Sequence, residues 1–364
     1  MTFYMPTKVY EERGCVETHA AELCALGTKA MLVTGKHSAK ANGSQRDVTA
    51  AMDACGMPYV VFDDVEENPS VETILKARDL AVEAGADLFV GIGGGSPMDA
   101  AKAVALMARN PDRGVDFLLG GDPDATWYPV VCVPTTCGTG SEVTGVSVLT
   151  IHEKKTKGSI PFRIFPELAL IDGNYLEDAP LSVLRSTAVD ALCHLCESYV
   201  NATATDYSRM CVLAGLEVWS RNKAFLADPD GARTTEILAS LMRASTLAGM
   251  AIAQTGTSLP HGLSYGLTYG LGVPHGKACG QFLAGYLNEA DPEDAGTVMN
   301  AAGFDSPADL HGFIMDLCGG VEVPSDLLDT MLDQLAGNPA KLRNAPFPAD
   351  REVLRRIAEF RGDR

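Results

Sequence analysis

The stretch DLFVGIGGGSPMDAAK, residues 87–102, runs from a short apolar segment through three glycines into a helical pattern. This order predicts a buried β-strand, a tight turn and the start of an α-helix. We expect Ser96 to cap the helix, with Pro97 at its first position and Asp99 three residues after the cap. Glycines at a helix N-terminus let phosphate oxygens reach backbone N–H groups, so the stretch indicates a diphosphate site. The alternative is a turn with a purely structural role.

The glycines do not follow the ordinary dinucleotide-binding fingerprint, because Met98 stands where the third glycine or alanine belongs. We therefore do not expect a standard Rossmann site. A second loop, TTCGTGSE at residues 135–142, follows the apolar run of residues 128–134. Its four hydroxyl groups and two glycines are suited to hydrogen bonds with a diphosphate or a ribose, although a solvated loop would have the same composition.

The two halves of the chain have different patterns. Short apolar runs alternate with helical segments up to Leu168–Asp172, which is typical of βαβ units. We predict an α/β N-terminal dinucleotide-binding domain with a mostly parallel, Rossmann-like sheet at residues 1–175. An all-helical, metal-binding and catalytic domain is predicted at residues 176–364, with the cofactor in a crevice between the two. The predicted helices of the second domain cover residues 181–200, 206–223, 234–253, 276–288, 306–317, 325–335 and 351–360.

Four residues of the second half have the character of metal ligands. Asp190 and His194 lie four apart in a helical segment, so both side chains leave one face. His261 and His275 each stand in Pro-His-Gly. Three imidazoles and a carboxylate suit Fe(II), Zn, Co or Ni, and we predict that they hold one divalent metal. Glu197, one turn past His194, either supports a ligand or is a charge on the helix face, and we favour the charge on the helix face.

Composition limits the classes of function. The chain has 364 residues, 46% hydrophobic and 21% charged, which is typical of a soluble globular enzyme. A net charge of -18 disfavours nucleic-acid and anionic membrane partners. Neither a signal segment nor eighteen uninterrupted apolar residues occur, so we expect a cytoplasmic protein. The ten cysteines lack a framework spacing, and most are interpreted as buried apolar residues.

The two loops and the four candidate ligands together resemble the iron-containing (group III) alcohol dehydrogenases over nearly the whole chain. The similarity is greatest to a subgroup resembling butanol and 1,3-propanediol dehydrogenases. It implies a dehydroquinate synthase-like architecture, Fe(II) or Zn at Asp190, His194, His261 and His275, and a homodimer or larger homo-oligomer. It also implies cofactor contacts at Gly94, Gly95, Ser96, Asp99, Thr135, Thr136, Thr139, Ser141, Lys157 and Leu176.

The residues after the run that ends at Thr34 bear on the choice of cofactor. NAD-preferring members of the family carry an aspartate there, whereas this chain has Gly35, followed by Lys36 and Ser38. A neutral gap with cationic and hydroxyl neighbours accepts a 2′-phosphate, so we predict that NADP(H) is preferred over NAD(H). Alternatively, the lysines here are only solvated loop charges.

The leading hypothesis is a metal-dependent, NAD(P)-linked oxidoreductase that interconverts a primary alcohol or diol and its aldehyde by hydride transfer. Tyr265, one helical turn beyond His261, stands where many members of the family have a histidine. We predict it as the catalytic proton relay, and the alternative is a tyrosine that only packs. Two other functions stay open: a polyol, glycerol or hydroxy-acid dehydrogenase on the same scaffold, and a non-catalytic nucleotide-binding regulatory protein.

Overall fold

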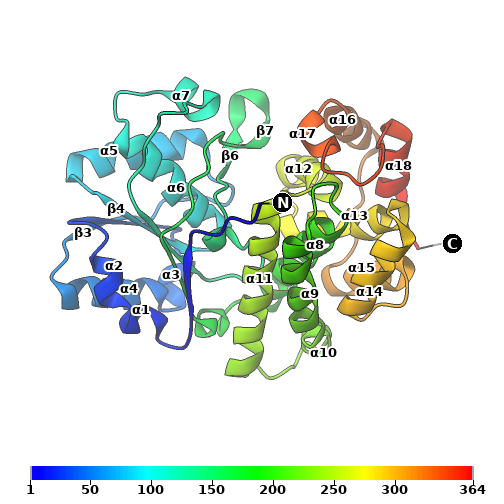
Figure 1. Ribbon diagram of the computed structural model, residues 1–364, viewed down its shortest axis with the longest axis horizontal. Helices are drawn as coiled ribbons and strands as arrows, with labels where there is room; N and C mark the ends of the chain where they lie inside the picture. The colour runs from blue at the N-terminus through cyan, green and yellow to red at the C-terminus, as the bar shows by residue number, and fades with distance from the viewer. Residues whose placement is uncertain (1, 363–364) are drawn as a thin grey trace. The chain divides into compact units, whose positions relative to one another are not determined.

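The computed structural model describes residues 2–362, and the chain divides into two compact units. An α/β unit contains Met5–Thr136 and Gly140–Ala179, and a helical unit begins at Pro180. The helical unit also takes in the segment that ends at Tyr4 and the short piece Cys137–Thr139. In Figure 1 strands and helices alternate in the part of the chain coloured from blue to green, and the part from α8 onward, coloured from green to red, is drawn as helices joined by loops. The long loop at residues 135–142 is therefore shared between the units.

The α/β unit is built on a six-stranded sheet in which every pairing is parallel. In spatial order the strands are β1 (Lys8–Glu11), β8 (Leu168–Ile171), β5 (Val130–Pro134), β4 (Leu88–Gly93), β2 (Ala30–Thr34) and β3 (Tyr59–Phe62). Because the strands are parallel, all their carboxyl ends lie at one edge of the sheet. The order reverses between β2 and β4, which is where α/β sheets of this kind bind ligands. The predicted parallel α/β fold is confirmed.

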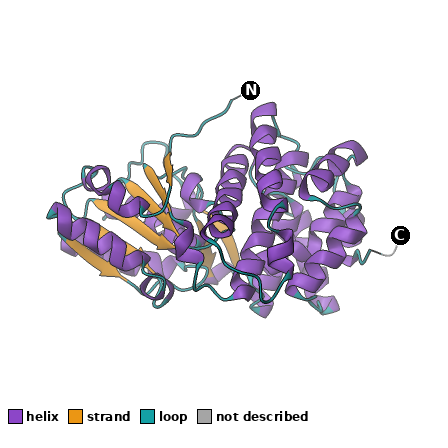
Figure 2. Ribbon diagram, turned by 90° about the horizontal axis from the view of Figure 1, so that it is seen from below, coloured by secondary structure: helices purple, strands orange, loops and turns teal. Residues whose placement is uncertain are grey.

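Helices cover both faces of this sheet (Figure 2). Alternate side chains of β2 enter two different cores, since Met31 packs on one face and Leu32 on the other. The first face is covered by α5 (Val71–Ala84), α6 (Gly95–Arg109) and α7 (Val115–Gly120). The second is covered by α1 (Cys15–Thr18), α2 (Ala20–Cys24), α3 (Ser38–Ala41) and α4 (Ser44–Cys55). Burial on both faces explains why the strands are almost continuously apolar.

The turn between β4 and α6 differs from the prediction in one respect. The helix begins at Gly95 with Gly94 as its N-cap, and no side chain caps it. Ser96, the predicted cap, lies inside the first turn and accepts a hydrogen bond from the backbone N–H of Asn68 at 3.0 Å. The prediction was wrong because Gly94 takes the extended cap conformation, which starts the helix earlier and leaves the Ser96 hydroxyl to Asn68.

Close packing explains why Met98 can stand where the ordinary fingerprint has its third glycine or alanine. A Cβ atom on Gly91 of β4 would lie 2.8 Å from the Cα atom of Met98. The close packing of α6 on the sheet, which a glycine of the helix provides in the ordinary fingerprint, is here provided by a glycine of the strand. Met98 itself is fully buried in the core beneath α6.

The helical unit is organised around α8 (Leu181–Val200), whose residues 188–200 are all buried. It packs against α9 (Asp206–Ser220), α11 (Thr235–Thr255) and α13 (His275–Glu289). The other helices are α10 (Lys223–Ala227), α12 (Leu259–Leu271), α14 (Pro292–Ala302), α15 (Pro307–Cys318), α16 (Ser325–Ala336), α17 (Pro339–Leu342) and α18 (Arg351–Glu359). An all-helical second half is as predicted, although α10, α12, α14 and α17 were not among the predicted helices.

Helix α11 is the only helix among residues 2–362 that is long and apolar enough to span a membrane. Of its most apolar window, 56% is buried inside the protein, and α11 packs against both α8 and α9. A helix in a protein core and a helix in a membrane both surround themselves with apolar groups, so they share this composition.

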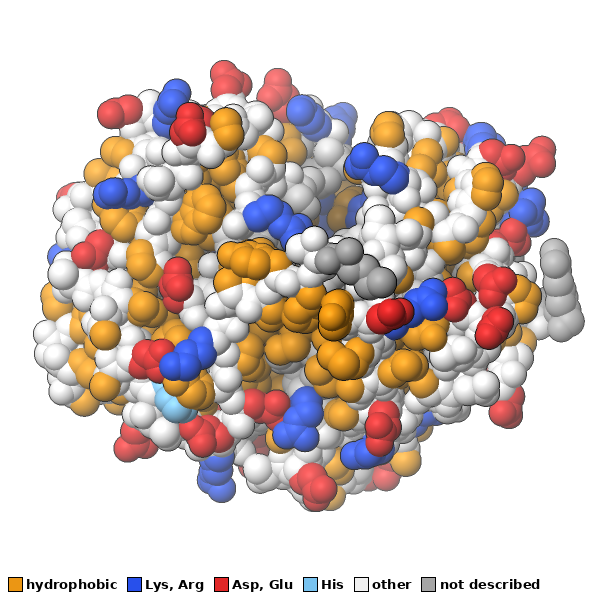
Figure 3. Space-filling model, viewed as in Figure 1, with side chains coloured by type: hydrophobic (Ala, Val, Ile, Leu, Met, Phe, Trp, Pro, Cys, Tyr) orange, Lys and Arg blue, Asp and Glu red, His pale blue; other side chains and the backbone are white. Residues whose placement is uncertain are grey.

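On the face drawn in Figure 3, acidic and basic side chains are interspersed rather than separated by sign.

Candidate metal centre and nucleotide-binding turns

Helix α8 presents Asp190, His194 and Glu197 at a spacing of four and three residues, so one face carries all three. Their exposed fractions are 2%, 5% and 0%, although ionisable side chains rarely lie so deep. A buried carboxylate needs partners to offset its lost hydration. The partners of these residues define the site.

Glu197 positions His261 in two ways. Its carboxylate accepts a hydrogen bond from the Nδ1 atom of His261 and another from the backbone N–H of Ser258. Ser258 is the N-cap of α12, so the carboxylate also lies at the positive end of that helix dipole. The interpretation of Glu197 as a helix-face charge was wrong, because spacing alone did not reveal that α12 begins against it.

His275 is positioned by close packing between helices. It is the first residue of α13, and a Cβ atom on the following Gly276 would lie 1.8 Å from the carbonyl oxygen of Ser186. The hydroxyl of Ser186 accepts a hydrogen bond from the backbone N–H of Lys277 at 3.2 Å. Glycine therefore allows the start of α13 to lie directly on α8, one turn before Asp190.

Four donor groups converge as a result. Single ligand atoms of Asp190, His261, His275 and Cys279 all lie within 4.8 Å of one another. The Oδ1 atom of Asp190 is 3.5 Å from Nε2 of His261 and 3.9 Å from Nε2 of His275. Ligands bound at roughly 2.0–2.2 Å to one ion stand about 3–4 Å apart, so this spacing fits a shared cation.

Two of these atoms lack hydrogen-bond partners. The Oδ1 atom of Asp190 and the Nε2 atom of His261 are buried without one. Burial favours the neutral form of Asp190, but the charges of the neighbouring His194, His275 and His261 hold the pKa of the carboxyl well below its ordinary value. The carboxylate is therefore ready to bind a cation, and the donor set fits a divalent metal.

His194 lies beside this group rather than within it. Its ring stacks on that of His261 with the centroids 4.4 Å apart, and its Nδ1 atom is 3.2 Å from the carbonyl oxygen of Gly138. Burial lowers the pKa of His194 to about 4. A neutral ring whose Nδ1–H donates to Gly138 keeps its lone pair on Nε2, the form in which histidine binds metals.

The predicted nucleotide-binding residues of the α/β unit follow the carboxyl ends of neighbouring strands. The backbone N–H of Thr135, after β5, donates to the carbonyl oxygen of Gly93, at the end of β4, at 2.9 Å. A Cβ atom on Gly94 would lie 3.2 Å from the side chain of Thr136. The structure thus brings the two loops into contact through their backbones. Thr139 belongs to the helical unit.

Asp99 and Ser141 are joined inside the protein. Asp99 accepts hydrogen bonds from the Ser141 hydroxyl at 2.5 Å and from the backbone N–H of Val148 at 2.8 Å. Lys102, fully buried, donates to the Ser141 hydroxyl at 2.7 Å and to the carbonyl oxygens of Ser141 and Val146, both at 2.8 Å. These bonds fix the second loop against α6, and sequence reasoning did not single out Lys102.

Asn68 is a further residue that sequence reasoning missed. It lies in the left-handed region with a φ of 59°, and its backbone N–H donates to Ser96. Its side-chain oxygen accepts a hydrogen bond from Nζ of Lys157 at 2.5 Å, and its carbonyl oxygen accepts one from the Thr150 hydroxyl at 2.7 Å. Two predicted cofactor residues, Ser96 and Lys157, therefore meet at Asn68. The sequence did contain one signal for this turn, because an asparagine directly before a proline, here Pro69, favours a turn.

Other predicted residues occupy the same edge of the sheet. Gly35, Lys36 and Ser38 follow β2, and the fully buried Leu176 follows β8. The Nζ atom of Lys36 is 2.8 Å from Asp64, and that of Lys40 is 2.5 Å from Asp63. These lysines are therefore paired on the surface rather than simply solvated.

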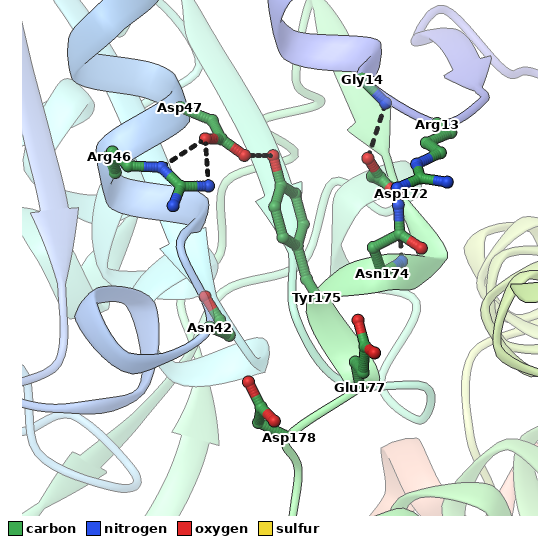
Figure 4. Close-up of a pocket in the computed structure, with 10 residues that line it drawn as sticks. All are labelled: Arg13, Gly14, Asn42, Arg46, Asp47, Asp172, Asn174, Tyr175, Glu177 and Asp178. Carbon is green, nitrogen blue, oxygen red and sulfur yellow. Dashed lines mark hydrogen bonds and ion pairs between the residues drawn. The ribbon is translucent and has the colours of Figure 1, made fainter. Parts of the chain in front are cut away.

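A polar hollow of about 310 Å³ also lies in the α/β unit (Figure 4). Tyr175 reaches across it, and its hydroxyl is 3.2 Å from the carboxylate of Asp47. The lining consists of Arg13, Gly14, Asn42, Arg46, Asp47, Asp172, Asn174, Tyr175, Glu177 and Asp178. None of the predicted cofactor residues lines this hollow, so it adds nothing to the candidate site.

Comparison with known proteins identifies the family. The model of iron-containing alcohol dehydrogenases matches residues 6–173, and that of the C-terminal part of Fe-containing alcohol dehydrogenases matches residues 185–309. The chain belongs to the iron-containing alcohol dehydrogenase family. It is thus an oxidoreductase of alcohols and aldehydes, and the predicted family and function are confirmed.

Individual members of the family resemble the chain along most of its length. An iron-containing alcohol dehydrogenase from Thermotoga maritima is 37% identical, with a TM-score of 0.90 and coverage of 98% of each chain. The lactaldehyde reductase of Escherichia coli K12 is 30% identical over 73% of this chain and 69% of its own. The NADPH-dependent butanol dehydrogenase of Clostridium saccharobutylicum is 29% identical over 78% of this chain and 72% of its own.

Proposed function

We propose that this iron-containing alcohol dehydrogenase interconverts a short primary alcohol or diol with its aldehyde, using NADP(H) and a divalent metal held by Asp190, His194, His261 and His275. The observation that supports the proposal most directly is the pair of buried atoms without hydrogen-bond partners, Oδ1 of Asp190 and Nε2 of His261, which face each other at 3.5 Å. A divalent cation offsets the cost of burying both.

The chemistry divides between the bound groups and the chain. A divalent cation and a nicotinamide, when bound, supply a Lewis acid for the substrate oxygen and an acceptor or donor for the hydride. With both groups bound, the chain's own residues would have to take up the hydroxyl proton that is released on oxidation. The α/β turns, through Gly94, Gly95 and Thr136, give the diphosphate access to backbone N–H groups. Asp190 and the histidines hold the cation in a region from which bulk water is largely removed by burial.

Tyr265 is our candidate for the proton relay. Its ring lies nearly parallel to that of His275, with the centroids 6.4 Å apart and the planes at 22°. Nζ of Lys341 lies 5.6 Å from the centroid of the tyrosine ring. Tyr265→Phe should lower kcat about 100-fold if the hydroxyl relays the proton, while metal content stays the same. Unchanged turnover would show that Tyr265 only packs.

The preference for NADP(H) is supported by Gly35, which leaves no carboxylate at the end of β2, and by the neighbouring Lys36 and Lys40. The surface ion pairs of these lysines with Asp64 and Asp63 are weak enough to rearrange around a phosphate. The test is kcat/KM with NADPH and NADH for the wild type and Gly35→Asp. The aspartate should reduce NADPH efficiency about 10-fold or more and spare NADH, whereas a wild type that favours NADH would refute the preference.

The metal assignment is tested with apoprotein prepared by exhaustive chelation. Activity should disappear and return with Fe(II) under anaerobic conditions or with Zn(II). His261→Ala should lose both metal and activity, while His152→Ala, at an exposed position of the α/β unit, should lose neither. A fully active metal-free protein would refute the assignment.

Two finer points are also proposals. A panel of primary alcohols, diols, polyols and 2-hydroxy acids would separate the leading substrate class from the polyol and hydroxy-acid alternatives. An inert protein under all these conditions would instead favour a nucleotide-binding regulator. We further propose a cytoplasmic homodimer or larger homo-oligomer, which sedimentation and cell fractionation test.

A further inference from the structure

Cys279 lies within the group of candidate metal donors. It follows His275 by four residues on α13, so the two side chains leave the same face of the helix. Its Sγ atom is 3.9 Å from Nδ1 and 3.8 Å from Nε2 of the His275 ring. The side chain is fully buried, and its sulfur is one of the four mutually close donor atoms.

The same place contains the two buried polar atoms that lack hydrogen-bond partners, Asp190 Oδ1 and His261 Nε2. They are a second observation beside the position of the cysteine, and they indicate that a positively charged group belongs among these side chains. Sulfur bonds to zinc at about 2.3 Å and nitrogen at about 2.0–2.1 Å, so sulfur and nitrogen ligands of one ion stand roughly 3.5–4 Å apart. The observed spacing between Cys279 and His275 falls in that range.

We propose that Cys279 adds a sulfur ligand to the divalent metal of the proposed Asp190, His194, His261 and His275 set, since its sulfur converges with three of these four residues. Binding transfers the thiol proton to solvent and gives a sulfur lone pair to the cation, with no change in oxidation state. The inference rests on the proposed metal site and deepens it. A thiolate softens a donor set otherwise made of nitrogen and oxygen, which shifts the site toward Zn(II) relative to Fe(II).

Other buried cysteines provide the contrast. Cys193 is fully buried on α8 next to His194 in sequence, but its sulfur is not among the convergent donors of the described residues. Its thiol is thus a matched control, equal in chemistry and burial but different in position. If Cys279 served only packing, replacement of either cysteine by alanine would leave the metal unaffected.

The test uses the full-length apoprotein reconstituted anaerobically with Co(II), because thiolate coordination gives a sulfur-to-cobalt charge-transfer absorption that nitrogen and oxygen ligands do not give. The wild type and Cys193→Ala should show this band, and Cys279→Ala should lose it while still binding Co(II). Competition with a chelator should show that Cys279→Ala weakens Zn(II) binding about 10-fold or more, since even outer partners contribute 10- to 100-fold.

Each other outcome is decisive in a different way. Stoichiometric Co(II) without the band in the wild type would overturn the sulfur ligand while leaving the proposed function intact. A band that persists in Cys279→Ala would do the same. A wild type that binds no Co(II) or Zn(II) would overturn both proposals. Should Cys279→Ala fail to fold, the wild-type spectrum together with that of Cys193→Ala still decides, because the loss of the band in the latter would assign it to Cys193.

Discussion

The Nδ1 atom of His261 donates a hydrogen bond to the fully buried carboxylate of Glu197, and the opposite ring atom, Nε2, faces Asp190. This bond fixes which nitrogen carries the proton and how the ring is turned. We therefore predict that Glu197→Gln weakens the affinity for Zn(II) about 10- to 100-fold, as loss of such outer partners does.

Metal affinity is measured by competition with a chelator. Glu236→Gln provides the control, because Glu236 is an exposed glutamate in the first turn of α11. A Glu197→Gln protein that binds zinc like the wild type would show that Glu197 serves only to cap α12.

Gly276 should tolerate no side chain. A Cβ atom would lie 1.8 Å from the Ser186 carbonyl oxygen, so Gly276→Ala must push α13 away from α8 and displace His275. We expect a loss of about 2–3 kcal/mol in the free energy of unfolding and a metal affinity reduced at least 10-fold. Gly312→Ala in α15 is the matched control, since nothing lies within 4 Å of its added Cβ. That change should stabilise the protein by about 0.5–1 kcal/mol, and equal effects of the two would contradict this account.

Lys102 should couple stability to cofactor binding. Lys102→Met leaves the buried acceptors of Ser141 and Val146 without their donor, at a cost of about 1–3 kcal/mol each. The second loop should then loosen, and the dissociation constant for NADPH, measured by fluorescence titration, should rise about 10-fold. Lys76→Met removes an exposed lysine from α5 and should change neither quantity. A destabilised protein with unchanged NADPH affinity would limit Lys102 to a structural role.

We predict that Asp87 contributes to the loss of folding stability of the α/β unit at acid pH. Burial alone would raise the pKa of this carboxyl, but hydrogen bonds from the Thr28 hydroxyl and the backbone N–H groups of Thr28 and Lys29 lower it. A lowered pKa in the folded state gives stabilisation that is present above the ordinary value of about 3.9 and is lost as pH falls through the folded value.

Asp87→Asn should therefore cost about 1 kcal/mol at pH 7, and the loss of stability between about pH 4 and lower values should be smaller than in the wild type. Urea unfolding across this range measures both. Asp53→Asn, at an exposed position of α4, should leave the profile unchanged. A variant with wild-type acid dependence would exclude Asp87 as the source.

Periodicity predicted most of the elements that bury a continuous apolar face, and in α12 it failed because glycines take part of that face. Helix α8 has the bounds expected from its spacing, residues 181–200. Helix α12 was missed because Gly262 and Gly266 recur at helical spacing in a segment of low helix propensity. Added Cβ atoms there would lie 2.6 and 2.3 Å from Leu335 and Met331 of α16, so the glycines serve close helix packing. Propensity cannot reveal a benefit that depends on a partner about 70 residues away.

The candidate site likewise contains residues that the sequence predicted and residues whose role only the fold reveals. Residue types and motif spacing pointed to Asp190, His261 and His275, which the fold brings together. Glu197 and Cys279 were misjudged or passed over, because their roles depend on which helix start or which donor lies opposite. Those contacts form between segments that are distant in sequence, so the pattern of residues around each position does not reveal them.

The carboxyl ends and the amino ends of the parallel strands lie at opposite edges of the sheet, and the two edges carry different groups. All the predicted nucleotide turns follow the carboxyl ends of the strands, whereas Cys55, the one cysteine among residues 2–362 with an exposed side chain, ends α4 just before the amino end of β3. A dye or a solid support attached through this thiol would sit at the opposite rim of the sheet. Cys55 thus offers a native attachment point for immobilisation or optical monitoring, away from the edge of the sheet at which we propose that the nucleotide binds.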